Sequence, residues 1–384
     1  MRLNNIRALG GVAMMAAVVL AAAGCSKTPD TPADAAKCGG KVAIFGAFTG
    51  GNAGVVTPSR DGAKLAVEKF NAANPKCLVT LVEFDTEGDG AKATPVANQV
   101  AQDQSFVAVI GGAFSGETRA TMPIYEAAGL VMVSQSATAT DLTTKGNKAF
   151  HRVVGNDDSQ GPAAASYIKN VLKSQKAYVV DDGTTYGGAL GATVKTQLGA
   201  IAVGSDKVQE KQVDFAATVS KVKNSGADAV FYGGYVNEAA PFLKQLRAAG
   251  YTGKFIGGDG IYDTAFATAV GAAAAEGAII TCPCIPSINA KGSFPADFKA
   301  KYTADPGPYA AEGWDAATVL LDGFKAGKTT RKELLDWVNA YNAPGLTKTI
   351  KFDPKGEVEA ANVVIWAYVV KGGVITPDVE VPKS

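Results

Sequence analysis

The stretch Phe106-Val107-Ala108-Val109-Ile110-Gly111-Gly112 is a short apolar run closed by two glycines, a pattern typical of a buried strand. A helical pattern follows over residues 118–128, Gly129 ends it, and a second apolar run occupies residues 130–133. The same alternation runs upstream, where strands are predicted at 42–45 and 78–84 and helices at 58–74 and 95–102. This order of strands and helices predicts an α/β fold with a parallel sheet covered on both faces.

A similar unit recurs 122 residues later in the chain. Ala229-Val230-Phe231-Tyr232 leads into Gly233-Gly234 and then into a helical pattern over residues 239–249. Each glycine pair falls where a strand meets the start of a helix, which is the edge at which open α/β sheets bind ligands. The repeat supports two similar lobes. After Pro286, helices are predicted at 294–302, 310–326 and 331–340, and strands at 349–352 and 363–370.

The composition limits the classes of function. The chain has 384 residues, 47% of them apolar and 19% charged, and its formal net charge is +1. This length suits two or three domains, and the apolar content is too high for a disordered chain. A near-neutral chain without runs of Lys and Arg argues against nucleic acid as a partner. His151 is the only histidine, which excludes most histidine-based metal sites.

The sequence offers little that resembles an enzyme motif. Gly327-Lys328-Thr329 resembles the end of a phosphate-binding loop, but it lacks the first glycine at the required spacing and ends a helix. The patterns G-x-G-x-x-G, G-x-S-x-G and H-E-x-x-H are absent. Asp181-Asp182 could serve acid–base chemistry, although capping of a turn is favoured, and a structural role is favoured for His151. We therefore expect a binding protein that uses no catalytic residue, metal or cofactor.

The first residues have the features of an export signal. Two arginines precede an apolar run from Ala8 to Ala23, and Gly24-Cys25 follows. Small residues directly before a cysteine resemble the lipobox of bacterial lipoproteins, whose cysteine is acylated. We expect a signal peptide over residues 1–24 and a tether over residues 25–37. A lipid on Cys25 would hold the protein at the extracytoplasmic face of the cell membrane. The alternative is an ordinary signal peptide cut near Ala23.

Four cysteines remain after Cys25, and an even number outside the cytoplasm suggests disulfides. Cys38 and Cys77 stand at the starts of the first two predicted strands, which are often neighbours in such sheets, so a bond between them is expected. Cys282-Pro283-Cys284 leaves three interpretations open, namely a disulfide within the motif, a redox site or a metal site. A redox site favours C-x-x-C at a helix start, and a metal site needs further ligands, so structural pairing is favoured.

Several motifs, in the same order along the chain, resemble those of the periplasmic leucine/isoleucine/valine-binding proteins: Val109–Gly112, Ser134–Leu142, Phe150–Arg152, Asp158–Gly161, Asp181 with Tyr186-Gly187, and Phe231–Tyr235. The resemblance covers about residues 40–370. Members of this family are substrate receptors of ABC importers with the type I periplasmic-binding-protein fold.

The resemblance implies two Rossmann-like lobes with parallel sheets, joined by three crossovers. The first lobe would comprise residues 38–154 and 286–345, and the second residues 155–285 and 346–384. Ligand would bind in the cleft between them, and the lobes would close over it by a hinge motion.

The resemblance also implies how an amino acid is held in the first lobe. Ser115 and Thr138 would bind the ligand carboxylate, helped by the positive end of a helix. The carbonyl of Ser136 would accept from the ammonium, and Ala137 lies in the same loop. The alternative is that Ser115 and Thr138 only cap helices.

In the second lobe, Asp259 stands where the family commonly has an acidic residue for the ammonium, although an Asp in a turn is the alternative. Tyr186 and Tyr235 match tyrosines that cover the ligand. The side-chain pocket would be lined by Val55, Phe114 and Trp314. Val55 departs from the family, which commonly has an aromatic residue there, so the ligand stays open.

We therefore expect a lipid-anchored receptor that delivers branched-chain or related amino acids to the membrane subunits of an ABC permease. Three alternatives remain. The ligand could be another amino acid, an amide or urea, or an aromatic acid, because a fold does not fix its ligand. The protein could sense its ligand for a signalling partner. An enzyme is the alternative from a different class, and it would change the ligand that a receptor returns intact.

Overall fold

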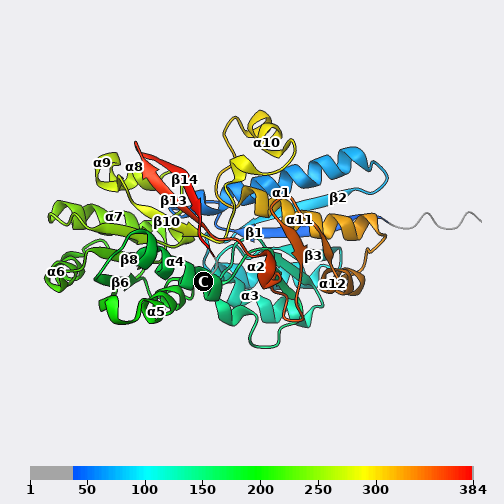
Figure 1. Ribbon diagram of the computed structural model, residues 1–384. Coiled ribbons are helices and arrows are strands. Elements are labelled where there is room, and N and C mark those ends of the chain that lie inside the picture. Colours follow the sequence, from blue (N-terminus) through cyan, green and yellow to red (C-terminus); the bar gives the residue numbers. More distant parts are fainter. Residues whose placement is uncertain (1–37, 383–384) are drawn as a thin grey trace, which may run out of the picture. The chain divides into compact units, whose positions relative to one another are not determined.

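The computed structural model describes residues 38–382, and these residues form two α/β lobes (Figure 1). The elements of the first lobe are β1 (Gly40–Gly46), α1 (Ala53–Ala73), β2 (Val79–Asp85), α2 (Gly90–Gln102), β3 (Phe106–Ile110), α3 (Ser115–Ala127), β4 (Val131–Ser134) and β5 (Phe150–Arg152), together with α10 (Phe294–Tyr302), α11 (Ala310–Lys325) and α12 (Arg331–Asn339). Its five strands are parallel and lie in the order β2-β1-β3-β4-β5.

The second lobe has a seven-stranded sheet. Its elements are α4 (Asp157–Ser166), β6 (Ala177–Asp181), α5 (Gly187–Leu198), β7 (Ala202–Lys207), α6 (Ala216–Ser225), β8 (Ala229–Gly233), α7 (Val236–Ala248), β9 (Lys254–Gly257), α8 (Phe266–Val270), α9 (Ala272–Ala275), β10 (Ile279–Cys282), β13 (Trp366–Lys371) and β14 (Val374–Glu380). The strand order is β14-β13-β10-β9-β8-β6-β7, and only β13 runs antiparallel to the other strands.

The two sheets repeat one topology. In each, the first strand lies between the second and the third, and the fourth and fifth follow on the same side, which is the flavodoxin-like order. The strand order reverses beside β1 and β3 in one lobe and beside β6 and β8 in the other, and ligands bind at such switch points. The predicted class, α/β with two parallel-sheet lobes, is confirmed.

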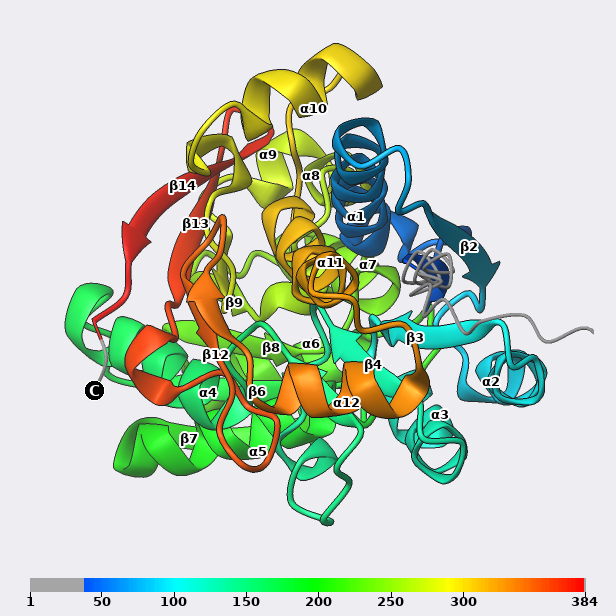
Figure 2. The same ribbon diagram turned by 90° about the vertical axis from the view of Figure 1, so that its right-hand side faces the viewer.

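Burial explains why these segments form strands, and close contacts at glycines explain why helices α1 and α11 pack together. All five residues of β3 and all five of β8 are buried, as expected for strands covered on both faces. Helices α1 and α11 cross closely (Figure 2). A Cβ on Gly62 would lie 1.9 Å from the carbonyl oxygen of Ala310, and one on Gly313 equally close to that of Ser59. This contact fixes the start of α11 beside the first sheet.

Some elements differ from the sequence prediction. The three helices predicted after Pro286 are present within one residue of their expected ends. Strands β7 and β14 were not predicted, because both are sheet edges with exposed residues and lack an apolar run. Two short helices, α8 and α9, are separated by Gly271, whose φ of +99° suits glycine.

The chain passes between the lobes three times, after β5, after β10 and after the hairpin of β11 (Asn342–Pro344) and β12 (Thr349–Lys351). After this hairpin the chain first lies along the first lobe. The N–H of Arg152 in β5 donates to the carbonyl of Gly356, and the Arg152 guanidinium pairs with Glu357 at 2.6 Å. Residues 349–358 therefore contact the first sheet before the chain enters β13.

The structure contains the expected cysteine pairs but does not describe the N-terminal residues for which a signal peptide and a lipid anchor are expected. The sulfur atoms of Cys38 and Cys77 are bonded in the structure, and so are those of Cys282 and Cys284. The expected signal peptide, the lipidated Cys25 and the tether over residues 25–37 lie outside the described residues. Among residues 38–382, no helix has the length and apolar character needed to cross a membrane.

Candidate functional site

A small cavity lies between the two lobes. Its lining residues are Val55, Ala113, Phe114, Ser115, Ser136, Thr138, Tyr186, Tyr235, Asp259, Gly260 and Tyr309. Apart from Val55 in α1 and Tyr309 at the start of α11, they all follow the carboxyl end of a strand.

The wall from the first lobe offers hydrogen-bond donors. Ser115 is the first residue of the 13-residue helix α3, and its Oγ accepts the N–H of Ala139 at 3.1 Å. Thr138 follows β4, and its Oγ1 is buried with no partner among the described residues. The positive end of a helix with free N–H and hydroxyl groups is a site for an anion such as a carboxylate.

The wall from the second lobe carries a negative charge. Asp259 is buried, its Oδ1 accepts the hydroxyl of Tyr186 at 2.8 Å, and its Oδ2 accepts that of Tyr309 at 2.7 Å. Tyr309 belongs to the first lobe, so the second bond joins the lobes. Burial raises the pKa of Asp259, while the two phenol hydroxyls oppose that shift. A cation beside this carboxylate would stabilise its charged form.

A second carboxylate lies behind the first. Asp157 is fully buried, and neither of its carboxylate oxygens has a hydrogen-bond partner among the described residues. Burial and the nearby charge of Asp259 together raise the pKa of Asp157 to about 8, while the neighbouring Thr138 hydroxyl and the charge of Arg152 oppose that shift. Its N–H donates to the carbonyl of Thr138 at 2.9 Å. Since neither Lys nor Arg lines the cavity, this side of the site favours a cationic group.

Aromatic rings close the remaining side of the cavity. The rings of Phe114 and Tyr235 lie 4.4 Å apart between centroids, and those of Tyr186 and Tyr235 lie 5.2 Å apart. Val55 adds an aliphatic surface from the first turn of α1. These groups form an apolar wall that suits the side chain of a small ligand.

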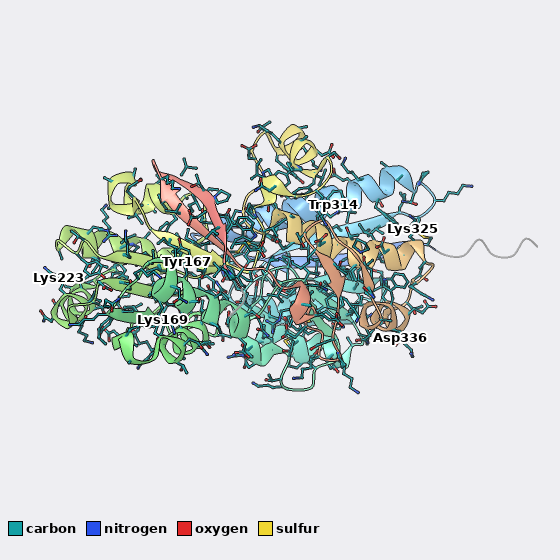
Figure 3. The ribbon with its side chains drawn as sticks, viewed as in Figure 1. Tyr167, Lys169, Lys223, Trp314, Lys325 and Asp336 are labelled. Atoms are coloured by element: carbon teal, nitrogen blue, oxygen red, sulfur yellow. A yellow bond between two sulfur atoms is a disulfide. The ribbon has the colours of Figure 1, made fainter. Side chains whose placement is uncertain are left out.

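The structure brings eight of the predicted site residues together around this cavity: Val55, Phe114, Ser115, Ser136, Thr138, Tyr186, Tyr235 and Asp259. Two others lie elsewhere. The carbonyl of Ala137 accepts from the Arg152 guanidinium at 2.8 Å. Trp314, which Figure 3 labels, packs against Phe294 of α10 and does not line the cavity.

The sequence analysis missed three residues that line the cavity, Ala113, Gly260 and Tyr309, and also the buried Asp157, which does not line it. Tyr309 lies far along the chain from the other site residues. The one sequence feature that could have marked it is its position directly before α11. Asp157 stands in the motif Asp157-Asp158-Ser159-Gln160, beside the residues quoted for the family resemblance. The other sequence expectations near the site hold: the carboxylates of Asp181 and Asp182 cap a turn by accepting the N–H groups of Gly183 and Thr184.

The crossovers beside the cavity are held by three buried charged groups. The Lys348 ammonium donates to the carbonyl of Val153 at 2.9 Å, in the first crossover. Glu312 accepts the N–H of Ile285 in the second, at 2.9 Å, and Asp315 accepts that of Leu346, in the turn of the hairpin that precedes the third, at 2.6 Å. Burial raises the pKa of Glu312 to about 7 and lowers that of Lys348.

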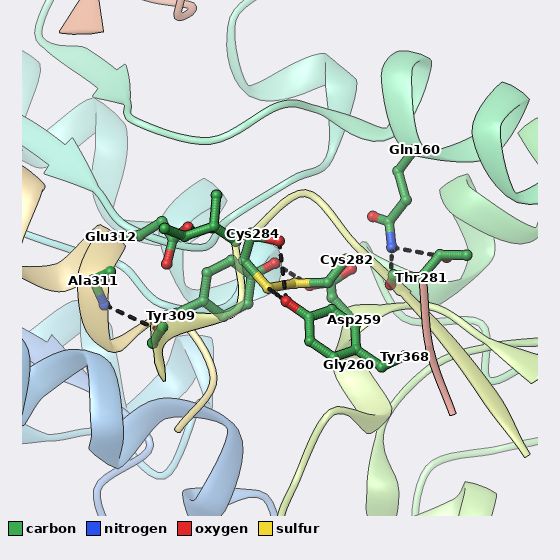
Figure 4. Close-up of a disulfide and its surroundings, with 12 residues drawn as sticks. Gln160, Asp259, Gly260, Thr281, Cys282, Cys284, Tyr309, Ala311, Glu312 and Tyr368 are labelled. Atoms are coloured by element: carbon green, nitrogen blue, oxygen red, sulfur yellow. Dashed lines mark hydrogen bonds between the residues drawn. A yellow bond between two sulfur atoms is a disulfide. The ribbon is translucent and has the colours of Figure 1, made fainter. Parts of the chain in front are cut away.

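Figure 4 shows the second crossover at close range. The Cys282–Cys284 disulfide lies with Tyr309 and Glu312 on one side and Gln160 and Thr281 on the other, and the hydroxyl of Tyr368 donates to the carbonyl of Cys284 at 3.2 Å. The disulfide thus belongs to a buried crossover. Within residues 38–382 no group of three or more His, Cys, Asp or Glu side chains is arranged to hold a metal ion.

Known proteins share this architecture. The family described as periplasmic binding protein matches residues 40–373. The chain is 30% identical over 335 residues to the leucine-, isoleucine-, valine-, threonine- and alanine-binding protein of Pseudomonas aeruginosa, which covers 85% of this chain and 89% of that protein.

Two solved structures show the same fold. The substrate-binding protein of a branched-chain amino acid transporter from Streptococcus pneumoniae, in complex with isoleucine, has a TM-score of 0.82 and 24% identity, over 88% of this chain and 99% of that one. A solute-binding protein from R. palustris in complex with benzoate has a TM-score of 0.77 and 21% identity, over 89% and 96%.

These relatives are named as binding proteins, in agreement with the expectation of a binding protein rather than an enzyme. The resemblance found in the sequence motifs is likewise confirmed by the family match and by the curated relative. The chain belongs to the periplasmic binding protein family.

Proposed function

We propose that this chain is the extracytoplasmic substrate receptor of an ABC importer and that it binds branched-chain or related L-amino acids between its lobes. The observation that carries the proposal is the division of charge across the cavity. Donors from α3 and Thr138 lie on one wall, and the carboxylate of Asp259 lies on the other. An α-amino acid presents a carboxylate and an ammonium that match these two walls.

In this binding mode the ligand carboxylate meets Ser115 and Thr138, and its ammonium meets Asp259. The side chain lies against Val55, Phe114 and the tyrosine rings. Burial of a leucine side chain contributes roughly 1.5–3 kcal/mol, and each hydrogen bond to a charged group contributes about 1.5–3 kcal/mol. Less the cost of closure, these terms are compatible with a Kd near 1 μM, about −8 kcal/mol.

Contacts between the lobes support closure around the ligand. The Tyr309–Asp259 bond and the Phe114–Tyr235 ring contact each join one lobe to the other. At the rim, the N–H of Asn237 donates to the side chain of Asn52 at 3.2 Å. These contacts would break on opening, while the three crossovers keep the lobes together, as in hinge closure.

The carboxylate of Asp259 also bears on the choice between an amino acid and an aromatic acid. Benzoate, the ligand of the R. palustris relative, has a carboxylate but no ammonium. It would leave Asp259 buried without a cation and would add a second negative charge to the cavity, which is unfavourable. We therefore expect amino acids to bind more tightly than aromatic acids.

Isothermal titration of the chain from Ser26 onward tests the proposal, after unfolding and refolding to remove any bound ligand. Leucine, isoleucine and valine are expected to bind saturably, with benzoate at least tenfold weaker. Binding of benzoate but of no amino acid would replace the ligand class, and binding of no member of the panel would reject both.

We also propose the finer features of the cellular form. Acylation of Cys25 would anchor the protein, which mass spectrometry of the detergent-extracted protein tests against cleavage near Ala23. The bonded pairs Cys38–Cys77 and Cys282–Cys284 would be oxidised in the exported protein, which thiol labelling tests. Pull-down of the membrane subunits of the permease tests the partner.

We propose the division into lobes that the sequence analysis expected, with one change. Residues 38–154 and 286–345 would form the first lobe, and residues 155–285 would belong to the second. We assign residues 346–358 to the first lobe, because Gly356 and Glu357 contact Arg152. Hydrogen exchange of the free and ligand-bound protein tests this assignment, since residues 346–358 should respond together with β5.

A further inference from the structure

One buried carboxylate beside the cavity has no role in the binding mode above. Glu117 is the third residue of α3, its side chain has no exposure to solvent, and it does not line the cavity. Its Oε1 accepts two backbone N–H groups, those of Ala113 and Phe114, each at 2.9 Å. Its Oε2 accepts the hydroxyl of Thr86, from the loop between β2 and α2.

The two N–H groups belong to residues that line the cavity. Ala113 and Phe114 stand between the Gly111-Gly112 turn and Ser115, and all three line it. The carbonyl of Ala113 accepts the hydroxyl of Ser136 at 2.9 Å, and the ring of Phe114 meets Tyr235 of the other lobe. The orientation of this short loop therefore decides where Ser115 presents its donors and where Phe114 meets the second lobe.

The same carboxylate ties the loop to its neighbour. Thr86 and Gly88 lie in the loop after β2, and a Cβ on Gly88 would lie 2.4 Å from the Phe114 ring. Burial raises the pKa of Glu117 to about 7, helped by the charge of Asp85, while the three donors oppose that shift. A carboxylate buried at this cost is retained for its hydrogen bonds.

We propose that Glu117 is a positioning residue for ligand binding: it holds the backbone of Ala113 and Phe114 so that the loop receives the ligand carboxylate, without touching the ligand. The proposal rests on the proposed function. A positioning role for Glu117 can be distinguished from a packing role, because packing requires only the volume of the side chain, whereas positioning requires its acceptor oxygens.

Three variants separate these roles. Glu117→Gln keeps an oxygen that accepts both N–H groups, and its amide can donate to Thr86, so leucine affinity should stay within about threefold of the unchanged protein. Glu117→Met keeps the volume but removes the acceptors, so affinity should fall at least tenfold. Thr86→Val removes only the third donor, so affinity should fall about twofold to fivefold.

The second lobe supplies a matched control. Glu238 is the third residue of α7, follows Gly233-Gly234 and is buried, but its carboxylate accepts the N–H of Lys211 at 2.6 Å. Glu238→Met should therefore leave leucine affinity within about threefold. Two-dimensional NMR adds a direct signature: the amide protons of Ala113 and Phe114 should resonate downfield in the unchanged protein and in Glu117→Gln, and should lose that shift in Glu117→Met.

The outcomes are distinguishable. If the unchanged protein binds no amino acid, the proposed function fails and this inference fails with it. If the unchanged protein binds leucine and folded Glu117→Met binds it equally well, only the positioning role is overturned. If Glu117→Met does not fold, Thr86→Val decides, and unchanged affinity in that variant overturns the role. Weaker binding by Glu117→Met and Glu238→Met alike would also overturn it, because burial at this helix position would then explain both.

Discussion

The molecule has two turns that contain a pair of glycines, Gly111-Gly112 in the first lobe and Gly233-Gly234 in the second. They have similar sequences but bring different chemical groups to the cavity. Each turn leads to an aromatic residue just before a helix, Phe114 or Tyr235, and the two rings meet across the cleft at 4.4 Å. The first turn has one residue more, Ala113, before that aromatic residue.

A buried carboxylate accepts the N–H of the aromatic residue in both lobes, but it comes from different places. In the first lobe it is Glu117, from the helix itself, at 2.9 Å. In the second lobe it is Asp182, from the end of β6, at 3.1 Å. The helix then starts with Ser115 in one lobe and Val236 in the other. The repeated topology therefore places both turns at the cavity, whereas a few residues make the first-lobe wall a donor of hydrogen bonds and the second-lobe wall an acceptor.

The largest expected effect is on the accepting wall. Asp259→Ala should lower leucine affinity at least ~30-fold, because loss of one partner of a buried, hydrogen-bonded charge pair costs about 2–5 kcal/mol. Isothermal titration measures the change. Asp259→Asn is the control that keeps the shape and the tyrosine contacts, and it should bind nearly as weakly, since the charge is what it lacks. Near-normal binding by Asp259→Asn would mean that the two walls do not differ by charge.

The next effect is on the donating wall. Thr138→Ala should weaken leucine binding by about 1.5–3 kcal/mol, the usual worth of a hydrogen bond to a charged group. Thr140→Ala, two residues on and outside the cavity lining, is the matched control and should bind normally. The same titration decides, and equal effects of the two substitutions would remove Thr138 from the site.

The third prediction concerns pH and the buried Asp157. Its folded-state pKa is about 8, while an unfolded Asp has a pKa of about 3.9. Between these values the folded protein holds a proton that the unfolded chain releases, so this group makes the free energy of unfolding fall as pH rises from about 4 to about 8.

Asp157→Asn removes that dependence. Without ligand, the unfolding free energy of Asp157→Asn minus that of the unchanged protein should therefore be larger at pH 8 than at pH 5. This increase should be at least ~1 kcal/mol, given about 1.4 kcal/mol per pKa unit. Urea unfolding at the two pH values measures it. A constant offset between the two proteins would show that Asp157 is already ionised in the folded state.

Much of the fold and part of the site follow from the sequence, because their signals are local. Strands buried on both faces appear as continuous apolar runs, and the glycine turns mark their ends. Ser115, Thr138 and Asp259 follow such strands within a few residues, so their shared edge could be predicted.

The rest depends on tertiary contacts that leave no local signal. Tyr309 reaches Asp259 across 50 residues of chain and two lobes. Trp314 lies five residues after Tyr309, and the helical twist of about 100° per residue turns it away from the cavity. The edge strands β7 and β14 are exposed and carry no apolar run to mark them.

The smallest expected effect concerns the second turn. Asp182 accepts three donors, the N–H and hydroxyl of Thr184 on Oδ1 and the N–H of Tyr235 on Oδ2. Asp182→Asn has a single acceptor oxygen and must give up part of this set, which loosens the backbone of Tyr235. We expect leucine affinity to fall about threefold, a loss of ~0.65 kcal/mol, which is below the usual worth of a hydrogen bond to a charged group because the ligand senses the change only through the backbone of Tyr235.

The neighbouring carboxylate is the control for this last substitution. Asp181 is partly buried and its Oδ1 accepts the N–H of Gly183, so Asp181→Asn should leave affinity unchanged. The effect of Asp182→Asn should also stay below that of Glu117→Met, since Tyr235 lies on the wall whose charge comes from Asp259 rather than from backbone donors. If titration reverses that order, the backbone of the second turn matters more than that of the first, and the division of roles between the two lobes would have to be redrawn.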